Sequence, residues 1–255
     1  YDDQITTTKA IADVNDLGLV NLKVNLTNSK YEVEDAHLNK SNILFAFKPA
    51  PSNDLKKVKD TVVAETSPLS LGIKNISLAD NLVQFDNLGA KPVAKGMDFN
   101  HLKIEGLNLG ASNVSYSASG IKANVKNGSL KEKSGFVLNE LKGDAVYNDK
   151  MIKLANFILK TPNTTIENAT ELNFTSMDDL TKHPERVKLS LSFKNTTIGL
   201  KDASFFSDAI PANYRNEKLK LNADVNGYLN NLNIPRLQIS GLKNIQINIS
   251  GKAKG

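Results

Sequence analysis

Hydrophobic and polar residues alternate along most of the chain with a period of two residues. The clearest example runs from 219 to 229, where apolar or small residues occupy every second position and mostly polar residues lie between them. A period of two indicates an extended strand, because successive side chains of a strand point to opposite faces. Most of the strands recognised in this way are apolar on one face only, which is typical of antiparallel sheets. The pattern therefore predicts an all-β fold.

The stretch 134–174 predicts three consecutive strands joined by tight turns, and its second strand contains a change of phase. Ile152 and Leu154 share one parity, whereas Phe157 and Leu159 share the other. An extra residue in one strand of an antiparallel pair produces such a slip and bends the sheet. We therefore expect a β-bulge between these two pairs of residues.

Few segments depart from the strand pattern. Residues 49–68 are bounded by prolines and are predicted to form an irregular insertion. A one-turn helix is expected after Ser176 and before Pro184, and a second short helix over 203–210 with Asp202 as its cap. The whole chain, 1–255, is expected to be a single elongated section of a longer protein, since it begins in the middle of a strand pattern.

Composition limits the possible functions. The chain has 255 residues, no cysteine, no tryptophan and a net charge of +5. Disulfides and cysteine-based metal or nucleophile sites are therefore excluded. The three arginines, Arg186, Arg215 and Arg236, stand far apart, which argues against nucleic acid as a partner. We find no apolar run long enough to form a membrane-spanning helix.

The residue types of catalytic and metal sites occur without productive spacing. The histidines His37, His101 and His183 are isolated, and no pair of them has the spacing of a zinc site. The carboxylates Asp178 and Asp179 are explained by their position at the start of a short helix. No nucleophile motif or phosphate-binding loop is present. The sequence therefore predicts no catalytic residues, no cofactor, no metal and no enzyme activity.

Several motifs in the C-terminal part of the chain carry a family resemblance. They are, in order, Lys131–Phe136, Leu138, Leu141, Leu159–Thr164, Asp202–Phe206 and Gly227–Leu232. Their order resembles a central or C-terminal-side section of the TamB family, the translocation and assembly module subunits of the AsmA-like superfamily. The resemblance covers roughly the last two thirds of the chain and continues to its end, whereas residues 1–95 are similar only in their strand pattern.

The resemblance implies a β-taco, in which a long twisted antiparallel sheet curls into a half-pipe with an apolar inner face. It also implies a place in the periplasm, within a full-length protein anchored in the inner membrane by an N-terminal segment. The implied partner is an outer-membrane barrel protein of the Omp85 type. The implied function is support of outer-membrane biogenesis, by phospholipid transport along the apolar groove, by assembly of outer-membrane proteins, or by both.

Alternation alone leaves other interpretations open. Two sheets that bury their apolar faces against each other would form a sealed β-sandwich, and such a repeat would have a structural or adhesive role. A surface carbohydrate-binding module is a third possibility, but the lack of tryptophan for stacking on sugars weighs against it.

If the apolar face is an open groove, its best-defined part is predicted in the last three strands. Phospholipid acyl chains would lie there against aliphatic side chains, each buried CH₂ group contributing about 0.8 kcal/mol. The candidate groove residues are Leu219, Leu221, Val225, Leu229, Leu237, Ile239, Ile245, Ile247 and Ile249.

Overall fold

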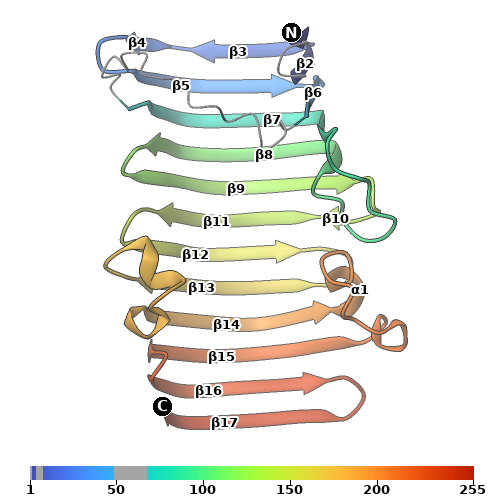
Figure 1. Cartoon of the computed structure of the whole chain (residues 1–255), viewed down its shortest axis with the longest axis vertical. Helices are drawn as coiled ribbons and strands as arrows, with labels where there is room; N and C mark the ends of the chain where they lie inside the picture. The colour runs from blue at the N-terminus through green and yellow to red at the C-terminus, as the bar shows by residue number, and fades with distance from the viewer. Residues whose placement is uncertain (1, 4–7, 49–67) are drawn as a thin grey trace.

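The structure is a computed structural model that describes residues 2–3, 8–48 and 68–255, and all seventeen of its strands belong to one sheet (Figure 1). The strands up to the long β7 are β1 (Asp2–Asp3), β2 (Thr8–Asp13), β3 (Asp16–Val20), β4 (Lys23–Asn25), β5 (Lys30–Asn39), β6 (Asn42–Phe47) and β7 (Ser70–Asn87). The strands that follow are β8 (His101–Ser117), β9 (Gly120–Glu132), β10 (Val137–Leu138), β11 (Glu140–Tyr147), β12 (Met151–Lys160), β13 (Thr165–Asn173), β14 (Lys188–Gly199), β15 (Lys218–Tyr228), β16 (Asn231–Gly241) and β17 (Ile245–Lys254). The short helices are η1 (Met177–Leu180), η2 (Pro184–Arg186), α1 (Leu200–Ala203) and η3 (Ala212–Tyr214).

From β7 onward the sheet is an antiparallel meander, in which successive strands pair in chain order up to β17. The strands lie in one layer, with the two ends of the chain at opposite ends of the stack (Figure 1). The sheet is not strongly curled and does not close on itself. The predicted all-β class, the single long sheet and the few short helices are thus confirmed.

The N-terminal part corrects the prediction of a wholly antiparallel sheet. The long strand β7 pairs in parallel with β5 along its first half and with β6 along its second half. Parallel neighbours need a crossover of a dozen or more residues, and the chain between β6 and β7 has that length. The predicted irregular insertion falls on this connection, and its residues 49–67 lie outside the described part of the chain.

Buried polar groups hold β5 and β6 in line along β7. The Ser41 amide, between the two strands, donates to Asn81 Oδ1 at 3.0 Å, and Asn81 Nδ2 donates to the Leu38 carbonyl at 2.7 Å. Asn81 and Ser41 are almost completely buried. The amide side chain therefore replaces the ladder bonds that are lost where β5 ends and β6 begins.

β-Bulges keep the apolar residues of the long strands on one face. In β12 the register against β13 shifts between Leu154 and Phe157, which confirms the bulge predicted from the change of phase. Asn156, inside this bulge, has a φ of 52°, and Asn113 and Asn195 have similar values at the bulges of β8 and β14. Asparagine tolerates this left-handed conformation better than most residues. Because a bulge adds one residue, the apolar residues after it lie on the same face as the apolar residues before it.

The second predicted helix is misplaced, because α1 covers Leu200–Ala203 instead of 203–210, and Asp202 lies inside it rather than capping it. The helix α1 ends at Ala203, and its N-cap is Gly199. The Asp202 carboxylate instead accepts hydrogen bonds from Thr161, from Asn163 Nδ2 at 2.9 Å and from Thr164 Oγ1 at 2.8 Å. It therefore ties α1 to the turn between β12 and β13.

The first predicted helix is present as η1, and a second turn that was not predicted, η2, begins at Pro184. The Asp179 carboxylate accepts hydrogen bonds from the amides of Thr175 and Ser176 at 2.9 and 3.0 Å, so it satisfies backbone donors at the start of η1. Phe174 and Val187, at the two ends of this segment, are buried. The residues that flank the short helices therefore supply part of the limited apolar core of the described residues.

We expect Asp202→Ala to lower the free energy of unfolding by about 2–3 kcal/mol, because it leaves three donors at a buried position without their acceptor. Urea denaturation would measure the change. The matched control is Asp149→Ala, which removes an exposed carboxylate from the turn before β12 and should change stability by less than about 0.5 kcal/mol. Equal effects of the two substitutions would contradict the role assigned to Asp202.

The contribution of Asp202 should also depend on pH. Burial raises the pKa of the Asp202 carboxyl, but the hydrogen bonds from Thr161, Asn163 and Thr164 outweigh burial and hold the pKa below its ordinary value of 3.8. A depressed pKa means that the stabilisation is fully present above pH 3.8 and is lost as pH falls through the lower native value. The stability difference between the native chain and Asp202→Ala should therefore shrink at acid pH, and a constant difference down to pH 2 would contradict this.

Candidate functional site: the apolar face of the sheet

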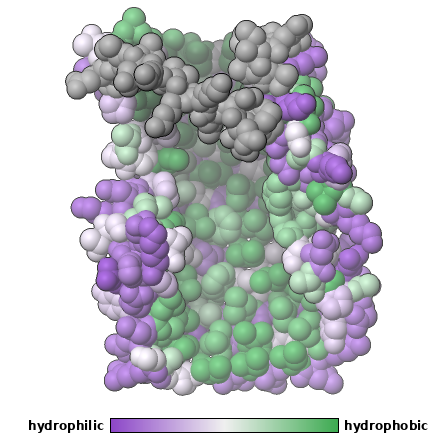
Figure 2. Space-filling view, in the orientation of Figure 1, coloured by the Kyte–Doolittle hydropathy of each residue, from purple (hydrophilic) through white to green (hydrophobic). Residues whose placement is uncertain are grey.

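One face of the sheet is apolar across most of its strands, and we call it the apolar face. From β12 to β16 the residues Ile152, Leu172, Leu189, Gly227 and Leu232 are successive cross-strand partners. Directly opposite residues of antiparallel strands lie on the same side of a sheet. Figure 2 shows apolar side chains gathered along the middle of one face, with more polar side chains along both sides.

The register places most of the candidate groove residues on this face. Leu221, Ile239 and Ile247 form one row across β15, β16 and β17. In the next row Leu237 and Ile249 are partners, opposite Ala223.

The remaining candidates lie around these rows. Leu219 and Ile245 are both opposite Gly241, and Val225 is opposite Leu191. Leu229 lies just beyond the end of β15, where no partner fixes its direction.

The apolar face is open at its C-terminal end. Ile245, Ile247 and Ile249 of β17 are 43%, 39% and 48% exposed, whereas Ala223 in the middle of the same face is buried. Among the described strands, β17 pairs only with β16. Large apolar side chains are therefore in contact with solvent at a row of neighbouring positions.

The apolar face extends further than the candidates recognised from the sequence. The row that begins at Leu172 and Ile152 continues through Tyr147, Ile121 and Tyr116 into β8. These strands were predicted from the sequence, but only residues of the regular C-terminal strands were predicted to line a groove, because the slips in the central strands obscure the parity. The residues in register could have been found by assigning a bulge to each slip.

The opposite face is polar and is linked by side-chain hydrogen bonds across strands. Asn124 and Asn156 each donate to one oxygen of Asp144, at 2.7 and 2.8 Å, and so connect β9, β11 and β12. These two bonds, that from Asn156 first, lower the pKa of the Asp144 carboxyl. Lys153 and Glu171 form an ion pair of 2.9 Å between β12 and β13. This face therefore has partners for its polar groups, in contrast to the apolar face.

Four aromatic rings gather where α1 meets the strand ends. Phe136 contacts Phe205 and Phe206 with ring centroids 5.8 and 5.2 Å apart, both in edge-on geometry, and Phe206 lies 6.4 Å from Phe99. Phe136 is buried, whereas Phe99 and Phe206 are more than half exposed. The sequence did not single out this cluster as a site, because its members come from three segments far apart in the chain.

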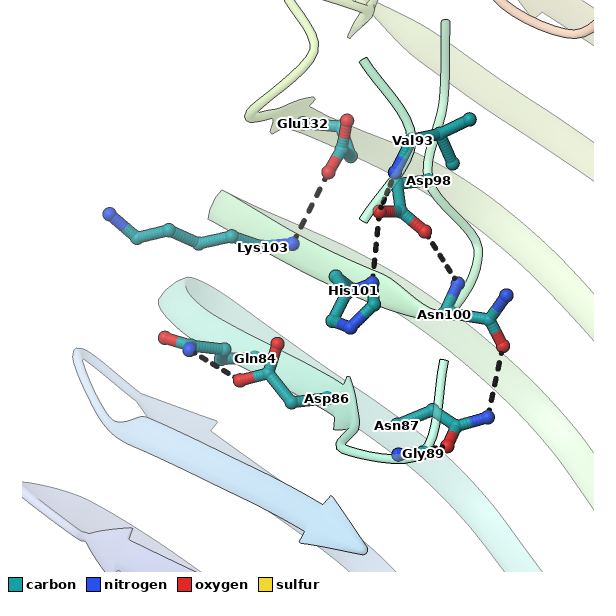
Figure 3. A network of polar contacts seen from close by, with 10 residues as sticks. All are labelled: Gln84, Asp86, Asn87, Gly89, Val93, Asp98, Asn100, His101, Lys103 and Glu132. Carbon is teal, nitrogen blue, oxygen red and sulfur yellow. Dashed lines mark hydrogen bonds and ion pairs between the residues drawn. The ribbon is translucent and has the colours of Figure 1, made fainter. Parts of the chain in front are cut away.

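The buried carboxylate Asp98 organises the segment between β7 and β8 (Figure 3). It accepts hydrogen bonds from the amides of Val93 and Asn100 at 2.9 and 3.1 Å and contacts His101 Nδ1 at 2.9 Å. Burial raises the pKa of Asp98, but these hydrogen bonds together lower it below its usual value. The arrangement fixes a loop, and we assign His101 this structural role.

Within the described ranges, no three histidine, aspartate or glutamate residues are grouped so that they could hold a metal ion. The carboxylate of Asp179 is occupied by backbone amides, while Asp178 faces solvent and pairs with Lys182 at 2.8 Å. In the same part of the chain, no helix is long and apolar enough to cross a membrane.

Comparison with protein-family models gave no match, and neither did searches of curated proteins and of solved structures. The resemblance to the TamB family therefore remains a prediction from the sequence.

We expect the buried and the open parts of the apolar face to respond differently to truncation of a side chain. Leu189→Ala should lower the free energy of unfolding by about 2–4 kcal/mol, because Leu189 is buried. Ile249→Ala, in the open β17 edge, should cost less than about 1 kcal/mol. Urea denaturation of both variants would measure this, and a large loss for Ile249→Ala would mean that β17 is covered in solution.

Proposed function

We propose that the apolar face of this sheet carries acyl chains of phospholipid, as one section of a bridge between two membranes. The observation that supports this most directly is the set of aliphatic side chains from β15 to β17, half-buried in β15 and β16 and exposed in β17, none of which faces a second layer among the described residues. Soluble monomers rarely expose an apolar patch larger than a few hundred Å². An apolar ligand would remove this surface from water.

The binding energy would come from burial rather than from directional bonds. Each CH₂ group removed from water contributes about 0.8 kcal/mol, so a chain of several carbons suffices for measurable binding. Because aliphatic side chains offer similar contacts at successive rows, an acyl chain could move along the sheet without breaking a specific hydrogen bond. The aligned rows, such as Leu221, Ile239 and Ile247, support such a path across strands.

The half-pipe expected from the TamB resemblance belongs to this proposal. In our proposal the apolar face is the floor of a shallow trough, and the segments at the strand ends, including η1, η2 and α1, form its two sides. The polar margins on both sides of the apolar strip in Figure 2 support this shape. By resemblance, the protein would work in the periplasm, anchored to the inner membrane and partnered by an Omp85-type barrel.

Assembly of outer-membrane proteins is the second function that the TamB resemblance implies. The sealed-sandwich alternative has less support, because the described strands form one sheet rather than two facing sheets.

We expect Ile247→Asp to abolish binding of a fluorescent acyl-chain probe while circular dichroism remains that of the folded sheet. Ile247 is 39% exposed on an edge strand, so a carboxylate there can reach water. Val225→Asp tests the same face in β15, two strands away from β17.

The matched control is Asn248→Asp, which introduces the same charge at the next residue of β17, on the opposite face. It should bind the probe as the native chain does. Loss of the folded spectrum in Ile247→Asp would support a sealed core instead, because a buried unpaired charge is strongly destabilising. Equal binding by Ile247→Asp and Asn248→Asp would overturn the proposed function.

A further inference from the structure

A cavity of about 450 Å³ lies between the segment before β8 and the segment around α1. Its lining includes three cationic side chains, Lys95, Lys201 and Arg215, and a single carboxylate, Asp208. Among the described residues, none of the three cations forms an ion pair with a carboxylate. The cavity therefore has an excess of positive charge that the described part of the chain does not neutralise.

A smaller cavity of about 60 Å³ adjoins the first one and shares Lys201 and Arg215 with it. It adds Lys218 and Glu217 to the charged groups, so cations remain in excess over both cavities. Arginine has a planar group with several donors that matches the oxygens of a phosphate, and lysine adds a mobile positive charge. This combination suits an anionic group with several oxygens.

The cavity is built by a close approach of two segments distant in sequence. The Met97 amide donates to the Phe205 carbonyl at 2.7 Å. Gly96, which lines the cavity, has a φ of 76°, and a Cβ at this position would lie 3.0 Å from the same carbonyl oxygen. A side chain at residue 96 would therefore strain the backbone and push the two walls of the cavity apart.

The cavity borders the apolar face. Leu138 is the cross-strand partner of Leu130, and Phe136 precedes Leu138 by two residues, so it points to the same side. Leu130 in turn shares the parity of Gly128, which is opposite Leu109, and a Cβ at Gly128 would lie 3.1 Å from Leu141, which has the parity of Tyr147 of the apolar face. Phe136 is therefore part of this face.

The aromatic cluster connects the two environments. Phe205 contacts Phe136 on one side and lines the cationic cavity. Only Phe136 and Phe205 therefore separate the apolar face from the three cations. A molecule could place its apolar part on the sheet and its anionic part in the cavity by passing these two rings.

We propose that this cavity binds the phosphate group of a phospholipid whose acyl chains lie on the apolar face. The inference rests on the proposed function, and it gives the headgroup a defined partner at the margin of the sheet. The volume is within the usual range of small-ligand sites, which is about 300–1,000 Å³. The ligand class is thus a phosphate ester attached to an apolar chain.

The test compares three probes on the whole chain by calorimetry: a short-chain phosphatidylglycerol, octyl glucoside as a neutral amphiphile, and inorganic phosphate. The variant is Lys201→Gln with Arg215→Gln. The control is Lys122→Gln with Lys252→Gln, which removes two charges from the polar face. We expect the cavity variant to weaken phosphatidylglycerol binding roughly tenfold or more, because it removes charge-assisted hydrogen bonds. Octyl glucoside binding should not change.

The outcomes separate this inference from the proposed function. If the native chain binds octyl glucoside but the cavity variant binds phosphatidylglycerol as tightly as the control does, the headgroup site is wrong and the apolar face stands. If the native chain binds neither amphiphile, the proposed function fails. If inorganic phosphate binds at Lys201 and Arg215 as tightly as phosphatidylglycerol does, the ligand is a free phosphate, and the lipid assignment is overturned.

Discussion

The fold depends on the antiparallel backbone ladder that runs from β7 to β17. A single-layer sheet cannot bury its apolar face against a partner layer, and few large apolar side chains of the described residues are fully buried. Main-chain hydrogen bonds and contacts between neighbouring strands must therefore supply much of the cohesion. In a meander, each strand contacts mainly the strands next to it. The free energy of unfolding is therefore close to a sum of contributions from pairs of neighbouring strands, as in repeat proteins.

The apolar face is continuous only if each strand keeps its apolar side chains on the same side of the sheet along its whole length. A slip of one residue would transfer every later side chain of a strand to the other face. Asn113, Asn156 and Asn195 prevent this at the bulges, since they adopt positive φ and thereby absorb the extra residue. Asn156 also donates to Asp144 on the polar face. The same residue thus fixes the phase of its strand and joins that strand to its neighbours.

The sequence predicted what depends on local pattern and missed what depends on distant contacts. The alternation gave the strands, and the slip between Leu154 and Phe157 gave a bulge, because both are properties of consecutive residues. The parallel pairing of β5 with β7 was missed, since strand direction depends on a crossover whose path has no local signal. Asp202 was interpreted as a helix cap, although its partners lie about forty residues earlier in the chain. The cationic cavity combines residues from two such distant segments, so its existence followed only from the three-dimensional arrangement.

The two proposed binding elements have opposite physical characters, and their balance would decide how a lipid behaves. The apolar face offers similar burial at every row, so it gives affinity without a fixed position. The cationic cavity offers directional, charge-assisted bonds at one point of the margin. A lipid would therefore pause where its phosphate meets Lys201 and Arg215, and it would slide elsewhere. Because these side chains are exposed, solvent and salt weaken their hold, and a weak hold is what a path for transport requires.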